Sequence, residues 1–340
     1  MTVIEPAASS GRRVLTGNLV TIIGVFLWST GFPATALLLE NWDPVLLATI
    51  RMSVAGITLS LLVIVSGRGK ELRQVRWRDA FLFGGCLLSL STTCLILAQN
   101  YADPTSVAII STGIPVISLF IGYLAGSEDL SSRKIVAIAF AIAGGITSAM
   151  ARITGLGDFH GGEIIILGSL VLFTIFTRNT VSRFQNVSDL TKGAATTAAA
   201  GLIMSIIITS VWASGLVTFR YDFNPRDLGL LLWIGGISAG ISMVLWFMGG
   251  RLLGVTIAAM HQNAVPFHVM MVMFLLGGGF VFDRLIAAAM VVFGVVLAQW
   301  SVKKTLATPS HTDDPSDPHK RPVIYGGGFS MLVSAIHYPR

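Results

Sequence analysis

The stretch from Gly24 to Phe32 reads Gly-Val-Phe-Leu-Trp-Ser-Thr-Gly-Phe, and a counterpart follows it 144 residues further on. The counterpart, Gly168 to Phe176, reads Gly-Ser-Leu-Val-Leu-Phe-Thr-Ile-Phe. More matches follow at slowly increasing offsets: Arg78-Asp79 with Arg226-Asp227 at 148, Gly144 with Gly294 at 150, and Thr105, Ala108 and Pro115 with Thr256, Ala259 and Pro266 at 151. A drifting offset of this kind predicts two copies of one structural unit that differ by small loop insertions.

The composition indicates a membrane environment. The chain has 340 residues, of which 53% are hydrophobic and 12% charged, and its mean hydropathy is +0.76. Soluble domains carry about 25% charged residues, so this chain lacks the charge that covers a soluble surface. Two cysteines exclude a disulfide-rich secreted scaffold. The net charge of +6 does not indicate a nucleic-acid partner, because the basic residues lie between apolar runs rather than in one patch.

Ten apolar segments have the length of a membrane span or come close to it, since crossing about 30 Å of hydrocarbon takes about 20 helical residues. They lie at about 18–39, 44–66, 79–99, 104–125, 133–151, 162–179, 191–214, 228–248, 253–276 and 284–302. The runs are continuous rather than alternating, which favours helices over barrel strands. We therefore predict an all-α polytopic membrane protein.

Basic residues set the predicted orientation, because positively charged loops stay in the cytoplasm. With the N-terminus inside, the opposite side holds only Arg152, Arg220, Arg226 and Arg284. We expect a multi-pass protein of the cell inner membrane with both termini cytoplasmic. Residues 1–17 are a cytoplasmic leader, and residues 303–340, with their Asp, Pro, Ser and His content, are a cytoplasmic tail predicted to be disordered.

Each copy of the repeat contains five spans, the first over residues 18–151 and the second over 162–302. Because five is odd, the second copy must enter the membrane inverted relative to the first. The predicted fold is thus ten transmembrane helices in two inverted five-helix repeats. This architecture is typical of secondary transporters, whose solute site lies near the midplane between the halves.

The stretch Thr105-Ser-Val-Ala-Ile-Ile-Ser-Thr-Gly-Ile-Pro115, followed by Gly126-Ser-Glu128-Asp-Leu and by Gly144-Gly145, resembles the helix 4–5 signature of EamA-type permeases. These permeases belong to the drug/metabolite transporter superfamily. Leu27–Phe32 resembles the first helix of that family, and Arg51 lies where the family often has an arginine. The resemblance implies efflux of an amino acid, metabolite or drug-like compound by alternating access. Glu128 aligns with Gly279 in the second copy, which disfavours a mechanism with paired carboxylates.

No motif for zinc, for a serine nucleophile or for phosphate binding is present in the sequence. We therefore predict a protein that is not an enzyme and needs no cofactor or metal. The expected partners are a small-molecule solute and the lipid bilayer, with the chain as a monomer or homodimer. Two alternatives stay open: a facilitator or exchanger of a larger metabolite such as a nucleotide sugar, and an intramembrane lipid-modifying enzyme.

Arg51 is the one formally charged side chain well inside a predicted span. Intramembrane charges are functional candidates, here for attracting a carboxylate or other anionic group. The alternative is that Arg51 extends outward and pairs with Asp43 or Asp103.

Polar side chains beside two prolines form the second group of candidates. Pro115 and Pro266 remove backbone hydrogen bonds and break their helices, which is tolerated only where protein or a cavity meets the freed groups. The candidate binding residues near these breaks are Ser111, Thr112, His261, Gln262, Asn263 and His268. Interhelical hydrogen bonding is the alternative role for all of them.

Helix 1 and the end of helix 3 supply the remaining candidates. Trp28, Ser29 and Thr30 place an aromatic ring and two hydroxyls in mid-span, and Asn100 lies at the end of helix 3. Tyr101 and Trp246 are interpreted as interface anchors, because aromatic residues gather at the membrane surfaces.

Overall fold

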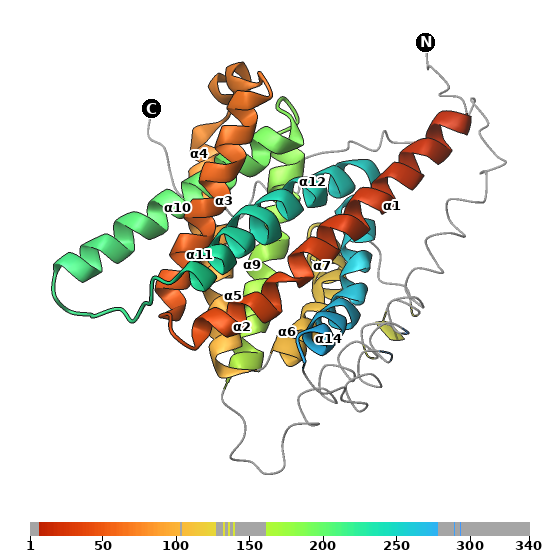
Figure 1. Ribbon diagram of the computed structural model, residues 1–340. Coiled ribbons are helices and arrows are strands. Elements are labelled where there is room, and N and C mark those ends of the chain that lie inside the picture. The colour runs from red at the N-terminus through yellow and green to blue at the C-terminus, as the bar shows by residue number, and fades with distance from the viewer. Residues whose placement is uncertain are drawn as a thin grey trace, which may run out of the picture.

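The computed structural model describes residues 7–102, 104–126 and 161–277, with isolated further positions at 132, 135, 136, 139, 289 and 293. All regular structure within these residues is helical (Figure 1). Seven of the described helices are long and apolar enough to cross a membrane: Gly11–Leu39, Pro44–Val65, Trp77–Tyr101, Pro104–Leu124, Gly162–Arg183, Asp189–Ala213 and Pro225–Leu253. The predicted all-helical, multi-pass class is therefore confirmed.

The elements follow the chain in two series. The first comprises α1 (Ala7–Ser29), α2 (Gly31–Leu39), α3 (Pro44–Val65), η1 (Gly69–Arg73), α4 (Trp77–Asp79), η2 (Ala80–Leu88), α5 (Ser89–Tyr101), α6 (Pro104–Ser111) and α7 (Ile114–Leu124). The second comprises α9 (Gly162–Arg183), α10 (Asp189–Ala213), α11 (Pro225–Leu232), η4 (Trp233–Ile241), α12 (Ser242–Leu253), α13 (Val255–Ala259), η5 (Met260–Ala264) and α14 (Val265–Leu275). Of the predicted spans 133–151 and 284–302, the structure describes only the isolated positions 135, 136, 139, 289 and 293.

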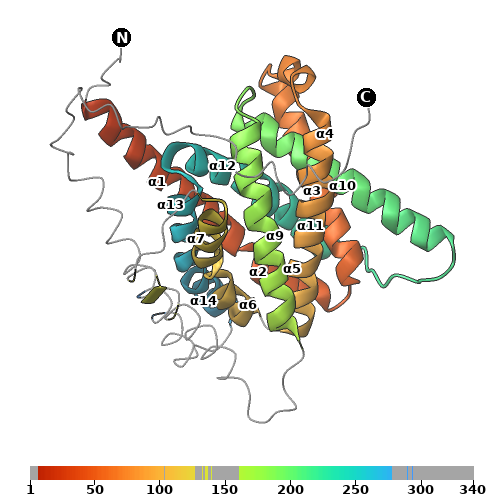
Figure 2. The same cartoon turned by 180° about the vertical axis from the view of Figure 1, so that it is seen from behind.

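Three predicted spans are interrupted. The first span breaks at Thr30, between α1 and α2, because Pro33 lacks an N–H and its ring clashes with the carbonyl four residues earlier. The span 104–125 breaks between α6 and α7, just before Pro115. The span 253–276 consists of α13, the 3₁₀ turn η5 and α14, whose second residue is Pro266. α6 and α14 lie side by side at one end of the molecule (Figure 2).

The two series share local features at related positions. The Asp43 carboxylate accepts from the N–H groups of Val45 and Leu46 at the start of α3, and the Ser188 hydroxyl accepts from Thr191 N–H at the start of α10. These two N-cap positions are 145 residues apart. The segments η2 and η4 are both π-helical, and each contains a Gly-Gly pair. Such π-helical segments are rare inside helices.

Contacts between the two series come in exchanged pairs. α3 packs closely on α10: a Cβ on Gly56 would lie 2.7 Å from Ala198 Cα, and one on Gly201 would lie 2.8 Å from Ser53 Cα. Gly56 and Gly201 are 145 residues apart, as are Ser53 and Ala198. Each contact thus occurs twice, with the roles of the two series reversed.

A second contact pair follows the same rule. A Cβ on Gly84 of η2 would overlap the carbonyl oxygen of Thr196, and one on Gly235 of η4 would lie 3.0 Å from the carbonyl oxygen of Arg51. Gly84 and Gly235 are related by an offset of 151, and Arg51 and Thr196 by 145. Glycine is required at both sites because the opposing backbone occupies the space of a side chain.

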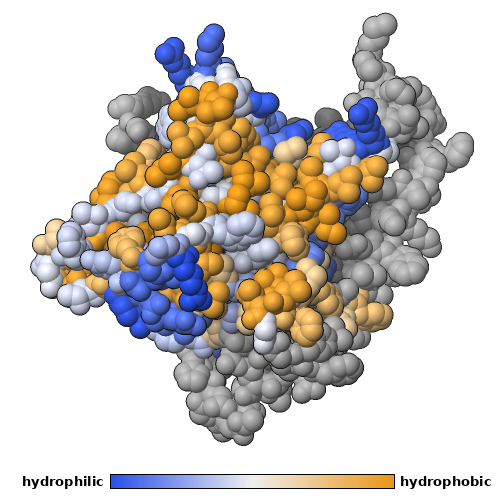
Figure 3. Space-filling view, in the orientation of Figure 1, coloured by the Kyte–Doolittle hydropathy of each residue, from blue (hydrophilic) through white to orange (hydrophobic). Residues whose placement is uncertain are grey.

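The outer surface is largely apolar. Large side chains such as Ile57, Ile64, Ile206 and Phe274 are more than half exposed. The space-filling view shows broad hydrophobic areas, with hydrophilic residues at the top and in a patch at the lower left (Figure 3). An exposed apolar surface of this extent fits contact with lipid.

Candidate functional site

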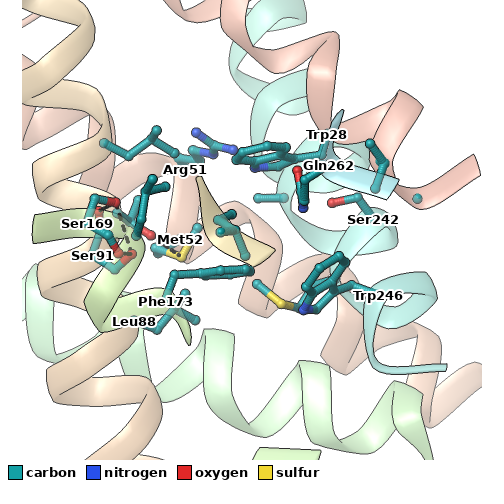
Figure 4. A pocket seen from close by; sticks show the side chains of 18 residues that line it. Trp28, Arg51, Met52, Leu88, Ser91, Ser169, Phe173, Ser242, Trp246 and Gln262 are labelled. Carbon is teal, nitrogen blue, oxygen red and sulfur yellow. Dashed lines mark hydrogen bonds between the residues drawn. The ribbon is translucent and has the colours of Figure 1, made fainter. Parts of the chain in front are cut away.

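A cavity of about 50 Å³ lies between the two series of helices (Figure 4). α1, α3, α5, α9 and α12 contribute most of its wall, and α7, η2, η4 and η5 supply single residues. The lining residues are Gly24, Val25, Trp28, Arg51, Met52, Leu88, Ser91, Thr92, Leu95, Ile114, Ser169, Leu170, Phe173, Ala239, Ser242, Met243, Trp246 and Gln262. Because one water needs about 10–15 Å³ in this measure, the space holds roughly four waters or one small chemical group.

Equivalent positions of the two series face each other across this cavity. The first series contributes Leu88, Ser91, Thr92 and Leu95, and the second contributes Ala239, Ser242, Met243 and Trp246. Figure 4 shows Leu88 and Ser91 opposite Ser242 and Trp246. Each residue of the first set is 151 residues before its counterpart in the second. The common spacing of three, one and three residues places each set on one face of its helix.

Arg51 is the charged residue of the wall. Its side chain is 3% exposed, and its Nε lacks a hydrogen-bond partner. The alternative in which Arg51 extends outward and pairs with Asp43 is wrong, because Arg51 is buried and the Asp43 carboxylate caps α3 instead. The other suggested partner, Asp103, lies outside the described residues. α3 holds the guanidinium near Gly31, where a Cβ would lie 3.8 Å from Arg51 Nη2 and would overlap the Ser238 hydroxyl.

The hydroxyl groups of the wall are already hydrogen-bonded within the protein. Ser91 Oγ donates to the Ser169 carbonyl at 3.0 Å, and Ser169 Oγ donates to the Ser91 carbonyl at 2.7 Å. Ser242 donates to the Ser238 carbonyl, and Thr92 donates to the Met52 sulfur at 3.6 Å. The two Ser91–Ser169 bonds join α5 to α9. Arg51 and Gln262, whose Oε1 has no partner, remain as the polar groups able to bind a solute.

Aromatic rings form the apolar part of the wall. Trp28 packs edge-on against Phe32 with ring centroids 4.8 Å apart, and Phe173 lies 5.9 Å from Trp246. Trp246 is 5% exposed and donates its indole N–H to Thr177 Oγ1 at 3.3 Å. The interpretation of Trp246 as an interface anchor is therefore wrong, whereas Tyr101 is 48% exposed.

Of the predicted binding residues, only Trp28, Arg51 and Gln262 line the cavity. Ser29 is buried, with its Oγ 3.4 Å from His268 Nδ1, and Thr30 accepts a hydrogen bond from Trp233. Asn100 is exposed at the end of α5. The remaining candidates bond mainly to nearby carbonyl groups of their own segments: Ser111, Thr112, His261 and Asn263.

Sequence reasoning missed most of the wall, including Met52, Phe173 and the residues of α5 and α12. The internal repeat carried a usable signal, because Ser91 and Ser242 match at the same offset of 151 as the two prolines. Among the described residues, no group of three or more His, Cys, Asp or Glu side chains is arranged to hold a metal ion.

The helices define a multi-pass membrane protein with a cavity between its two series of helices. The family model described as "EamA-like transporter family" matches residues 15–149, so the resemblance to EamA-type permeases is confirmed, and it is carried by this part of the chain. Among solved structures 28 chains match, and one described as "Crystal structure of protein" has a TM-score of 0.66 at 16% identity, over 85% of this chain and 98% of that chain. This similarity concerns the fold alone. No curated protein matches.

Proposed function

We propose that the chain is a secondary transporter that moves a small organic solute by alternating access between two inverted five-helix halves. The observation that carries the proposal is the central cavity, whose wall uses equivalent positions of both halves. Secondary transporters built from inverted repeats bind their solute at such an interface. The halves in this proposal are residues 18–151 and 162–302, with ten spans in total.

The exchanged contacts support a two-fold relation between the halves. Gly56 contacts Ala198 while Gly201 contacts Ser53, and Gly84 contacts Thr196 while Gly235 contacts Arg51. A contact that recurs with the roles of its partners reversed is what a two-fold axis produces. For units with an odd number of spans, such an axis lies in the plane of the membrane.

The direction of transport and the orientation are part of the proposal. Basic side chains gather after the last residue of α3, near the start of α10 and near the last residue of α12, among them Arg68, Lys70, Lys192 and Arg251. This distribution supports a cytoplasmic position for those ends and for both termini in the inner membrane. Efflux follows from the family resemblance, with residues 303–340 as a cytoplasmic tail.

The lipid-modifying alternative requires catalytic side chains that converge at one depth. The described cavity wall contains no His, Cys, Asp or Glu.

A cysteine-accessibility experiment tests alternating access. Cys86 and Cys94 are first replaced by serine, and Ser242→Cys is then exposed to a charged, membrane-impermeant thiol reagent from each side of proteoliposomes in turn. We expect reaction from both sides and loss of solute uptake after reaction. Ile57→Cys, in the middle of α3 on the apolar outer surface, faces lipid in this proposal; it is the control and should not react. Reaction of Ser242→Cys from one side only, in a folded protein, contradicts the mechanism.

A second experiment identifies a transported solute. Proteoliposomes are screened for uptake of amino acids, other small metabolites and drug-like cations, with and without a pH gradient. Uptake of at least one of these solutes above that of protein-free vesicles is the expected result. A folded protein that moves none of them would remove the support for transport.

A further inference from the structure

We propose that the transported solute is a small organic anion, with its carboxylate or equivalent planar oxyanion bound by Arg51. The inference rests on the proposed transport function and names the substrate class for that site. It starts from an imbalance of charge in the cavity, where a cation lies among neutral side chains.

Arg51 differs from Lys192, the other buried cation among the described residues. Lys192 is 1% exposed, and its Nζ lies 2.7 Å from Asp189 Oδ1. Arg251 pairs with the other oxygen of the same carboxylate. For Arg51, in contrast, the described residues supply no ion pair, and its Nε has no hydrogen-bond partner. An unpaired buried cation is unfavourable unless something compensates it.

The guanidinium group suits one kind of partner. Its planar N–H donors match the two oxygens of a carboxylate, and such charge-assisted pairs are stronger than neutral hydrogen bonds. A solute cation would be repelled, since the cavity wall offers no carboxylate in return. The lining hydroxyls of Ser91, Ser169 and Ser242 are bonded to backbone carbonyls and do not compete for the anion.

The rest of the wall selects the body of the solute. Trp28, Phe173 and Trp246 present apolar rings, and Met52, Leu88 and Leu95 are also apolar. Figure 4 shows Arg51, Trp28 and Gln262 along one edge of the cavity and Phe173 and Trp246 along the opposite edge. Apolar rings beside a single cation favour an anion with a short apolar or aromatic body.

Paired probes test the substrate class in the purified, full-length protein. Each acid is compared with its neutral amide: benzoate with benzamide, phenylacetate with phenylacetamide, and butyrate with butyramide. Binding is followed by the fluorescence of the cavity tryptophans and by thermal stabilisation. We expect at least one acid to bind at least tenfold more tightly than its amide, because the charged pair is lost in the amide.

Variants locate the effect. Arg51→Gln should remove the preference for the acid, and Arg51→Lys should keep part of it. Arg226→Gln removes the same charge from an exposed position and should leave the preference unchanged. If Arg51→Gln does not fold, the acid–amide comparison in the wild-type protein decides alone.

The outcomes separate the two proposals. If no acid binds wild-type protein better than its amide, or if folded Arg51→Gln keeps the preference, the anionic substrate class is wrong. Transport of neutral or cationic solutes in the same proteoliposomes would then leave the transport function standing. Acids that bind through Arg51 but never cross the membrane would support the anion site and contradict transport.

Discussion

Lys192 and Asp189 form a buried ion pair one helical turn apart, with Lys192 Nζ 2.7 Å from Asp189 Oδ1. The same carboxylate also accepts a hydrogen bond from Arg251 Nε at 2.7 Å. Asp189 therefore joins the start of α10 to the end of α12. The Asp189 carboxylate is therefore the negative partner of both cations at this end of the protein.

Replacing this carboxylate should destabilise the protein strongly. Asp189→Asn leaves Lys192 buried without a counter-charge, and breaking a buried pair in this way costs about 3–5 kcal/mol. The measurement is the thermal stability of the detergent-solubilised protein. Glu40→Gln, which neutralises an exposed carboxylate, is the control and should change stability by less than about 0.5 kcal/mol. Equal stabilities of the two variants would refute this assignment.

Close helix packing gives a second prediction. Gly56→Ala and Gly201→Ala should each destabilise the protein by about 1–3 kcal/mol, because the new methyl group meets the backbone of the opposite helix below 3.0 Å. Gly168→Ala has open space around it and should stabilise α9 by up to about 1 kcal/mol through helix propensity. The unfolding temperatures of the three variants test this order. If neither Gly56→Ala nor Gly201→Ala lowers the unfolding temperature, the close contact between α3 and α10 does not contribute to stability.

Glu71 provides a prediction about pH. Partial burial alone raises the pKa of its carboxyl, but hydrogen bonds from Ser188 and Thr191 and the charge of Arg68 outweigh it and hold the pKa below its ordinary value. A lowered pKa contributes stability that is complete above the ordinary value of about 4.3 and is lost as the pH falls through the folded value.

We therefore expect η1 to detach from the start of α10 at low pH. Proteolysis at Lys70 should accelerate as the pH falls below about 4, once the intrinsic pH dependence of the protease is subtracted. Glu71→Gln should show the faster cleavage already at pH 7. Lys70 is exposed, so cleavage there reports on the loop. A flat profile in both proteins would contradict the role of Glu71.

The sequence predicted the membrane class and most span positions because hydropathy and span length are local properties. It also pointed to the breaks before Pro115 and Pro266, since proline acts on its own helix. It missed the cavity role of Trp246, because the position of a residue along a span does not tell which neighbour it faces. It chose Asn263 together with Gln262, although only the side chain of Gln262 reaches the cavity wall.

The last prediction uses that difference between two neighbouring amides. Gln262 lines the cavity with an unpartnered Oε1, whereas Asn263 donates its Nδ2 to the Met260 carbonyl within η5. Gln262→Leu should therefore lower the uptake of a transported solute at least about tenfold, equivalent to roughly 1.4 kcal/mol, with normal folding. Asn263→Leu should lower thermal stability instead, because the buried Met260 carbonyl loses its side-chain donor.

Trp28 completes the comparison. Trp28→Ala removes an aromatic wall of the cavity and should also lower uptake at least about tenfold, while Trp212→Ala removes a tryptophan that is 63% exposed and should not. Uptake in proteoliposomes is normalised to the amount of folded protein measured by size-exclusion chromatography. If Gln262→Leu and Trp28→Ala transport normally, the solute binds elsewhere and the cavity is a packing defect. If they fail only because they do not fold, their side chains support the helices rather than the solute.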